Sequence, residues 1–197
     1  MSEKELSGVP FAVLRDFIAW IKAENIRGII IGGIAASFLG RPRVTRDVDS
    51  VVIIAPDILE KFVHSGKQFG FIPRITDIFA FSQKSRVLLM KHETTGIDID
   101  ISLGVLPFEY ESIERALWID AGGLLLPLPT PEDLIVMKAV AHRQRDLIDI
   151  ESILDANPNL DLERIRRWVR EFSTALEMPE ILNDLEKIIS EQQGRMI

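Results

Sequence analysis

Along the first two thirds of the chain, apolar residues recur with a period that changes from segment to segment. Some segments have the period of a helix, and others have that of a strand. Residues 11–21 carry apolar side chains three and four positions apart, the spacing of one helix face. Short β-branched runs predict buried strands at residues 29–31 and 46–54, and the second run contains two acids on alternate positions. Two further strands are expected at residues 86–91 and 97–103, joined by a Thr-Thr-Gly turn.

Helices are expected between these strands. A short one is predicted at residues 34–39, another from Pro56 to Gly70, and a third from Pro107 to about Trp118. A last strand is expected at residues 124–128. The order of strands and helices therefore predicts an α/β fold with a sheet at its centre.

The pattern changes after Pro129. Thr130 and Pro131 have the residue types of a helix cap and a first helical position, and two acids follow in the first turn. The rest reads as helix, broken near Pro158 and Pro179. We therefore expect an α/β core over residues 1–128 and a helical part over residues 129–197, packed on that core.

Composition narrows the functional classes. The 197 residues are 47% hydrophobic and 27% charged, values typical of a globular protein with a core. There is no cysteine, so a metal site would use acids or one of three histidines. A net charge of −7 argues against a large non-specific nucleic-acid surface. No signal peptide or membrane-spanning segment is apparent, so a cytoplasmic location without membrane association is expected.

Two pairs of acids are the candidate metal-binding and catalytic residues. Asp47 and Asp49 share one face of their predicted strand, about 7 Å apart. Asp98 and Asp100 alternate in the same way with three isoleucines, so one of them is expected beside the first pair. Such carboxylates repel one another unless a cation lies between them, and Mg²⁺ prefers hard oxygen ligands of this kind. A pair of solvated acids at a strand end is the alternative.

A glycine pair precedes the first acids. Gly32 and Gly33 lie between a predicted strand and a predicted helix, where backbone N–H groups can approach a phosphate at the positive end of the helix dipole. Glycine is common in turns between strands and helices, so the pair alone does not indicate a phosphate site. It does so only together with the acids that follow about a dozen residues later.

Together these motifs resemble the nucleotidyltransferase superfamily. The runs are I-I-G-G-I-A, R-V-T-R-D-V-D-S and I-D-I-D-I, with P-E-D-L and H-R-Q-R-D later in the chain. The nearest resemblance is to bacterial minimal nucleotidyltransferases that include the AbiE-type toxins. The resemblance implies a polymerase-beta-like core with a mixed sheet plus a C-terminal helical half, and covers roughly residues 28–155.

The resemblance also implies site residues, carried over position by position. Asp47, Asp49 and Asp100 match the metal ligands and catalytic acids for Mg²⁺ or Mn²⁺, with Asp98 as the alternative third acid. The matched nucleotide-binding positions are Gly32, Gly33, Thr45, Arg46, Lys138 and Arg145, and Lys138 is also expected to act in catalysis. Ile34 stands where relatives often have serine. Lys138, His142, Arg145 and Asp149 would form one stripe if their stretch is a single helix.

The implied reaction transfers a nucleoside monophosphate from a nucleoside triphosphate such as ATP to a hydroxyl of RNA, protein or a small molecule. The third acid is the expected general base. An antitoxin protein is the expected partner if the protein is a toxin. Two alternatives stay open: an antibiotic-modifying nucleotidyltransferase, and a non-catalytic nucleotide-binding regulator with a degenerate site.

Overall fold

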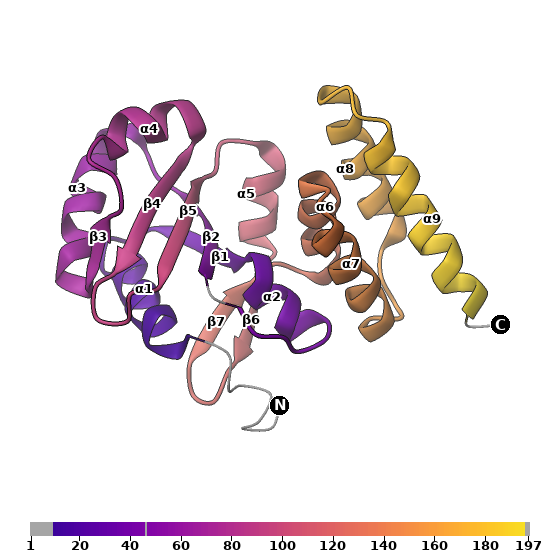
Figure 1. The fold of residues 1–197 in the computed structure, drawn as a ribbon, viewed down its shortest axis with the longest axis horizontal. Coiled ribbons are helices and arrows are strands. Elements are labelled where there is room, and N and C mark those ends of the chain that lie inside the picture. The colour runs from indigo at the N-terminus through magenta and orange to yellow at the C-terminus, as the bar shows by residue number, and fades with distance from the viewer. Residues whose placement is uncertain (1–9, 46, 196–197) are drawn as a thin grey trace. The chain divides into compact units, whose positions relative to one another are not determined.

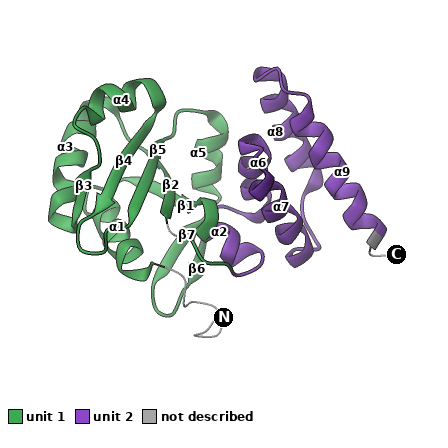
Figure 2. Ribbon diagram, viewed as in Figure 1, with its two compact units in different colours: residues 1–34, 43–128 green, residues 35–42, 129–197 purple. Residues whose placement is uncertain are grey.

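The computed structural model of the chain describes residues 10–45 and 47–195 (Figure 1). The chain divides into two compact units, each described here by itself (Figure 2). Unit 1 comprises residues 1–34 and 43–128, and unit 2 comprises residues 35–42 and 129–197. Residues 35–42, which the sequence places in the α/β part, therefore cluster with the helical part.

A five-stranded mixed sheet forms the centre of unit 1 (Figure 1). Its order is β1-β2-β5-β4-β3, with only β2 and β5 running parallel among the paired strands described. The strands are β1 (Arg27–Ile31), β2 (Asp47–Ile53), β3 (Phe71–Pro73), β4 (Val87–His92) and β5 (Asp98–Leu103). This arrangement confirms the predicted α/β class with a mixed sheet.

The helices of unit 1 bury an aromatic cluster beside the sheet. They are α1 (Phe11–Ala23), η1 (Pro56–Ile58), α3 (Leu59–Ser65), η2 (Gly66–Phe69), α4 (Ile78–Ser85) and α5 (Pro107–Glu114). The Trp20 ring stacks on Phe62 at 4.1 Å between centroids and on Phe71 at 5.2 Å. Because all three side chains are fully buried, this cluster fixes α1 and α3 against the start of β3.

One prediction for unit 1 is corrected, and two elements of the unit were not predicted. The helix that begins at Pro107 ends at Glu114, and Trp118 lies in β6 (Leu117–Asp120), which pairs with β7 (Leu125–Leu128) as a separate two-stranded sheet. The strand β3 and helix α4 were not predicted. Three-residue strands have too few positions to show a period, and β6 acquires its strand character from pairing with β7.

Unit 2 is helical, as α6 (Pro131–Ala141), α7 (Gln144–Ala156), α8 (Leu162–Ala175) and α9 (Glu180–Arg195). Thr130 caps α6 by accepting a hydrogen bond from the Asp133 N–H at 3.2 Å. The C-terminal part of α2 (Gly32–Leu39) belongs to this unit, where Asn157 donates to the Leu39 carbonyl at 2.8 Å. None of the helices in the described ranges combines the length and the apolar character needed to cross a bilayer.

The stretch after Pro131 is not one helix. His142 has a left-handed backbone, with φ 51°, and it separates α6 from α7. The predicted stripe of Lys138, His142, Arg145 and Asp149 is therefore wrong as a single helix face. Left-handed conformation is uncommon in non-glycine residues, and histidine is enriched in it only several-fold, so the presence of His142 alone did not predict the break.

Candidate active site

The two acid pairs lie side by side on the two parallel strands. In the register of β2 and β5, Asp47 pairs with Asp98 and Asp49 pairs with Asp100. Paired strands lie about 4.8 Å apart, and residues two apart point to the same face. All four carboxylates therefore gather on one face of the sheet, in a patch that is partly open to solvent. The preference for Asp100 over Asp98 as third ligand stays a prediction.

The glycine turn touches this patch directly. Gly32 begins α2 with φ 64°, and a Cβ atom at this position would lie 2.7 Å from the Cγ of Asp49. Only glycine therefore fits, because both the left-handed backbone and the close carboxylate exclude a side chain. The contact places Asp49 at the first turn of α2, where the helix dipole favours negative charge.

Residues 43 and 45 lie against the next glycine. A Cβ on Gly33 would be 3.1 Å from an Nη atom of Arg43 and 3.3 Å from the Cβ of Thr45. Thr45 is buried, and its hydroxyl donates to the Asp47 carbonyl at 2.8 Å. Arg46 lies outside the described residues. Arg43 was missed as a site residue because its long side chain reaches the turn only through the fold.

Arg74 is a second residue that the sequence analysis missed. It follows β3 and donates to Asp98 Oδ2 at 2.7 Å and to Asp100 Oδ1. Its own N–H donates to the Leu89 carbonyl at 2.9 Å, and Leu89 pairs with Asp100. Arg74 thus lies in line with Asp100 across the sheet and bridges two of the four acids.

The charge balance of the patch favours protonation of Asp100. Burial raises the pKa of the Asp100 carboxyl, the Arg74 guanidinium lowers this pKa, and Asp47 and Asp98 raise it again. The net direction is upward from the ordinary value. Arg74 therefore compensates only part of the burial and repulsion that this carboxylate experiences.

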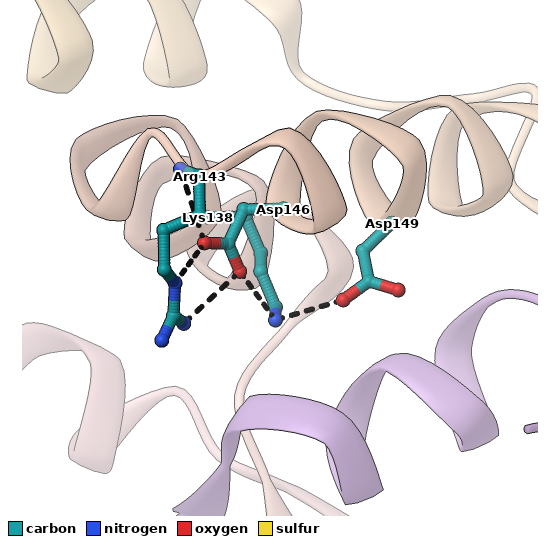
Figure 3. Close-up of polar contacts among 4 residues, drawn as sticks. All are labelled: Lys138, Arg143, Asp146 and Asp149. Carbon is teal, nitrogen blue, oxygen red and sulfur yellow. Dashed lines mark hydrogen bonds and ion pairs between the residues drawn. The ribbon is translucent and has the colours of Figure 1, made fainter. Parts of the chain in front are cut away.

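Lys138 lies in a different setting, inside unit 2. Its Nζ contacts Asp146 Oδ1 and Asp149 Oδ2, both at 2.8 Å, as Figure 3 shows. All three side chains are buried, and Arg143 adds a second cation to Asp146 at 2.6 Å. Burial would raise the pKa of Asp146, but hydrogen bonds from Arg143 and Lys138 bring it below its ordinary value.

Arg145 and His142 are arranged differently from Lys138. Arg145 is an exposed residue of the first turn of α7, and His142 Nε2 lies 3.0 Å from Asp184 Oδ2 in α9. The nucleotide-binding roles of Lys138 and Arg145 remain predictions. Within unit 2, the bonds described give Lys138 a structural role.

A family model for nucleotidyltransferases of unknown function, DUF6036, matches residues 14–189. The match includes the glycine turn, the four acids, Arg74 and Lys138. The chain belongs to this family. It is thus a nucleotidyltransferase, with the fold class predicted from its motifs.

Solved structures share the fold of this nucleotidyltransferase at low sequence identity. The antibiotic-resistance factor ANT(2'')-Ia in solution has a TM-score of 0.58 and 14% identity, over 85% of this chain and 93% of its own. An antigenic nucleotidyltransferase-like protein from Paracoccidioides brasiliensis has 0.54 and 18%, over 94% of each. The lincomycin-bound lincosamide antibiotic adenylyltransferase LnuA has 0.51 and 14%, over 80% and 99%. No curated protein sequence matches the chain significantly.

The donor set of the patch suits a divalent cation. Carboxylate oxygens are the ligands that Mg²⁺ and Mn²⁺ prefer, and in this patch the Arg74 guanidinium already lies between two carboxylates. Within the ranges that the structure describes, no three acidic or histidine side chains are arranged to hold an ion as they stand. The residues fit such an ion in chemistry and register, provided that Asp100 turns from Arg74.

Proposed function

We propose that this nucleotidyltransferase transfers a nucleoside monophosphate from a nucleoside triphosphate to an acceptor hydroxyl, with divalent metal held by Asp47, Asp49 and Asp100. The observation that carries the proposal is the register that aligns Asp49 with Asp100, with Gly32 against the Asp49 carboxylate. Acids that merely face solvent do not require a glycine beside them. The arrangement supports a site in which backbone, carboxylates and phosphate come close together.

The glycine turn and its neighbours are proposed to bind the triphosphate. Gly32 and Gly33 allow phosphate oxygens to approach the start of α2, where the helix dipole is positive. Arg43 lies against Gly33 and brings a guanidinium to the same turn, a group that pairs well with phosphate. Thr45, through its bond to the Asp47 carbonyl, fixes the start of β2.

Asp100 is proposed to take the proton of the acceptor hydroxyl. Its raised pKa makes it a stronger base than an ordinary aspartate. The acceptor oxygen then forms a bond to the α-phosphorus, the bond from that phosphorus to the bridging oxygen breaks, and pyrophosphate leaves. Bound Mg²⁺ or Mn²⁺ would supply charge neutralisation for the phosphates and a lower pKa for the attacking hydroxyl.

The acceptor is proposed to be a hydroxyl of RNA, protein or a small molecule, and the experiment distinguishes these. Each α-labelled nucleoside triphosphate is incubated with the protein, Mg²⁺ or Mn²⁺, and total RNA, cell protein or small-molecule fractions. Label is expected to appear in one acceptor with release of pyrophosphate. Asp47→Ala and Asp49→Ala should remove transfer, whereas Asp57→Ala, an exposed acid of η1, should retain it.

Absence of transfer with every triphosphate and acceptor would overturn the proposal, as would full transfer in Asp49→Ala. The motif resemblance to AbiE-type toxins adds a finer proposal, an antitoxin protein as partner. A stable complex with the product of a neighbouring gene, and relief of growth inhibition by that product, would support it.

A further inference from the structure

Arg74 is held in place by its backbone and directed at the acids by the sheet. It directly follows Pro73, the last residue of edge strand β3, and its N–H continues the ladder to Leu89 on β4. Leu89 lies opposite Asp100 on β5. The contact between the guanidinium and the carboxylates is therefore fixed by the pairing of the strands, and it is not a chance contact between surface side chains.

The salt bridge leaves part of the guanidinium unsatisfied. The two Nη atoms donate to Asp98 and Asp100, but the buried Nε has no hydrogen-bond partner among residues 10–45 and 47–195. A buried donor without a partner destabilises the arrangement that contains it. A polyphosphate, with several oxygens on each phosphorus, can accept from Nη and Nε together, so it offers Arg74 a better set of partners.

A guanidinium and a divalent cation cannot both occupy the Asp100 carboxylate at full strength. Arg74 already donates to Asp100 Oδ1, so a metal ion at either oxygen of this carboxylate would lie next to the guanidinium, and the two cations would repel each other. Asp98 shares the guanidinium, so the bridge is held at two points and opens less readily than a single ion pair. Binding of one cation at Asp100 therefore weakens the binding of the other.

We propose that Arg74 is an internal competitor of the metal, which holds Asp100 until a polyphosphate draws the guanidinium away. The inference rests on the function proposed above. It assigns Arg74 two opposed effects: it weakens the binding of metal alone, and it strengthens the binding of the triphosphate. Because the coupling between two ligands is reciprocal, metal and nucleotide then bind cooperatively.

The test measures each ligand alone, without turnover. Mn²⁺ binding to the full chain is followed by the electron paramagnetic resonance signal of the free ion, and ATP binding is measured by calorimetry in EDTA. Arg74→Ala should bind Mn²⁺ at least about fivefold more tightly than the wild type, the lower end of typical coupling. It should bind metal-free ATP at least about fivefold more weakly.

Lys91→Ala is the matched control. The Lys91 ammonium lies 3.6 Å from Asp98 Oδ1, so its removal changes the net charge of the patch equally without freeing the Asp100 oxygen from Arg74. Its effect on Mn²⁺ affinity should be clearly smaller. If Lys91→Ala and Arg74→Ala tighten Mn²⁺ equally, the effect is general electrostatics and the proposal fails. Where Arg74→Ala does not fold, Arg74→Gln gives the same comparison.

Asp49→Asn separates this inference from the proposed function. If neither wild type nor Arg74→Ala binds Mn²⁺ in a manner that depends on Asp49, the metal site itself is refuted. If Mn²⁺ binding depends on Asp49 but is unchanged or weaker in Arg74→Ala, only the role of Arg74 is refuted. Tighter Mn²⁺ with unchanged ATP binding would likewise refute the exchange of Arg74 onto phosphate.

Discussion

Each unit places one cation between two aspartates, yet the two clusters differ in burial and in charge balance. In unit 1, Arg74 bridges Asp98 and Asp100, with side chains 23%, 39% and 43% exposed. In unit 2, Lys138 bridges Asp146 and Asp149, with side chains 6%, 1% and 7% exposed. The first cluster is open to an exchange of partners, whereas the second is closed.

The pKa directions follow from what surrounds each bridge. Burial and further carboxylates keep the pKa of Asp100 raised despite Arg74, while Arg143 and Lys138 together lower the pKa of Asp146 despite burial. The unit 1 cluster has an excess of negative charge that favours an added cation. The unit 2 cluster satisfies its own charges. Similar residues therefore form a partly exposed cluster with excess negative charge in one unit and a buried cluster with balanced charge in the other.

The largest expected effect is on the stability of unit 2. Lys138→Ala leaves Asp146 and Asp149 buried without their shared cation, which should lower the free energy of unfolding by about 3–5 kcal/mol. Urea unfolding measures it, and Lys187→Ala, an exposed lysine of α9, should change it by less than about 0.5 kcal/mol. Equal stability of both variants would show that the cluster in unit 2 is not structural.

The same variant tests the nucleotide-binding prediction for Lys138. Under conditions where Lys138→Ala remains folded, a contact with the triphosphate would add a loss of about a hundred- to a thousandfold in transfer rate. Unchanged transfer by the folded variant would confine Lys138 to the structural role.

The next effect separates the two acids that share Arg74. Asp100→Asn should lower the transfer rate by about a hundred- to a thousandfold, because it removes the proposed base and metal ligand. Asp98→Asn removes an equal charge and an equal Arg74 contact, so it is a matched control, and it should cost less than about tenfold. Steady-state rates with saturating metal give the comparison, and the reverse order would assign Asp98 as the third ligand.

Gly32→Ala probes the contact that brings Asp49 to the glycine turn. The left-handed backbone and the clash with the Asp49 carboxylate should together destabilise the protein by about 1–3 kcal/mol and reduce transfer. Gly96→Ala has the same sign of φ, at 71°, but no atom of the described part of the chain lies within 4 Å of its Cβ. It should therefore show the backbone strain alone, with transfer retained. Equal transfer by both variants would show that the close contact between Gly32 and Asp49 does not contribute to activity.

The smallest effect is the pH dependence of stability. Because the pKa of Asp100 is raised by folding, this residue contributes to the free energy of unfolding. The contribution is fully present below the unfolded pKa of about 3.9, and it is lost as the pH rises through the pKa of the folded state. Asp100→Asn should therefore raise the melting temperature near pH 7, and this gain should vanish as pH falls toward about 4.

Asp146 should behave in the opposite way. Its lowered pKa gives stability that is present above about pH 3.9 and is lost as pH falls through the lower folded value. Asp146→Asn should lower the melting temperature near pH 7, with the loss shrinking only below about pH 4. The same sign for both variants would contradict the contrast between the clusters.

Regular elements with a clear period were predictable from the sequence. The strands with alternating acids and the capped helix after Thr130 show their structure locally, so the sheet centre and the start of α6 agree with expectation. The strand order was not accessible, because register depends on contacts between segments about fifty residues apart. The aligned acids were therefore expected as a group, but their pairing was not.

The features that could not be predicted from the sequence depend on tertiary contacts. Arg74 follows a three-residue strand with no period, and its partners come from β5. The break at His142 turns Asp146 and Asp149 toward Lys138, a geometry that a single helix would not provide. Long cationic side chains reach acids on other elements only after folding. Neither salt bridge could therefore be predicted from the local sequence pattern.

The short edge strand β3 affects how readily the backbone opens at Arg74, the residue that follows it. Three residues hold it to β4, and Pro73 has no N–H to donate. A short edge strand with few hydrogen bonds is expected to open at a lower free energy than a central strand such as β5. The amide of Arg74 should thus exchange with deuterium sooner than those of β5. The backbone that carries the guanidinium is therefore expected to open more readily than the strand that carries the acids.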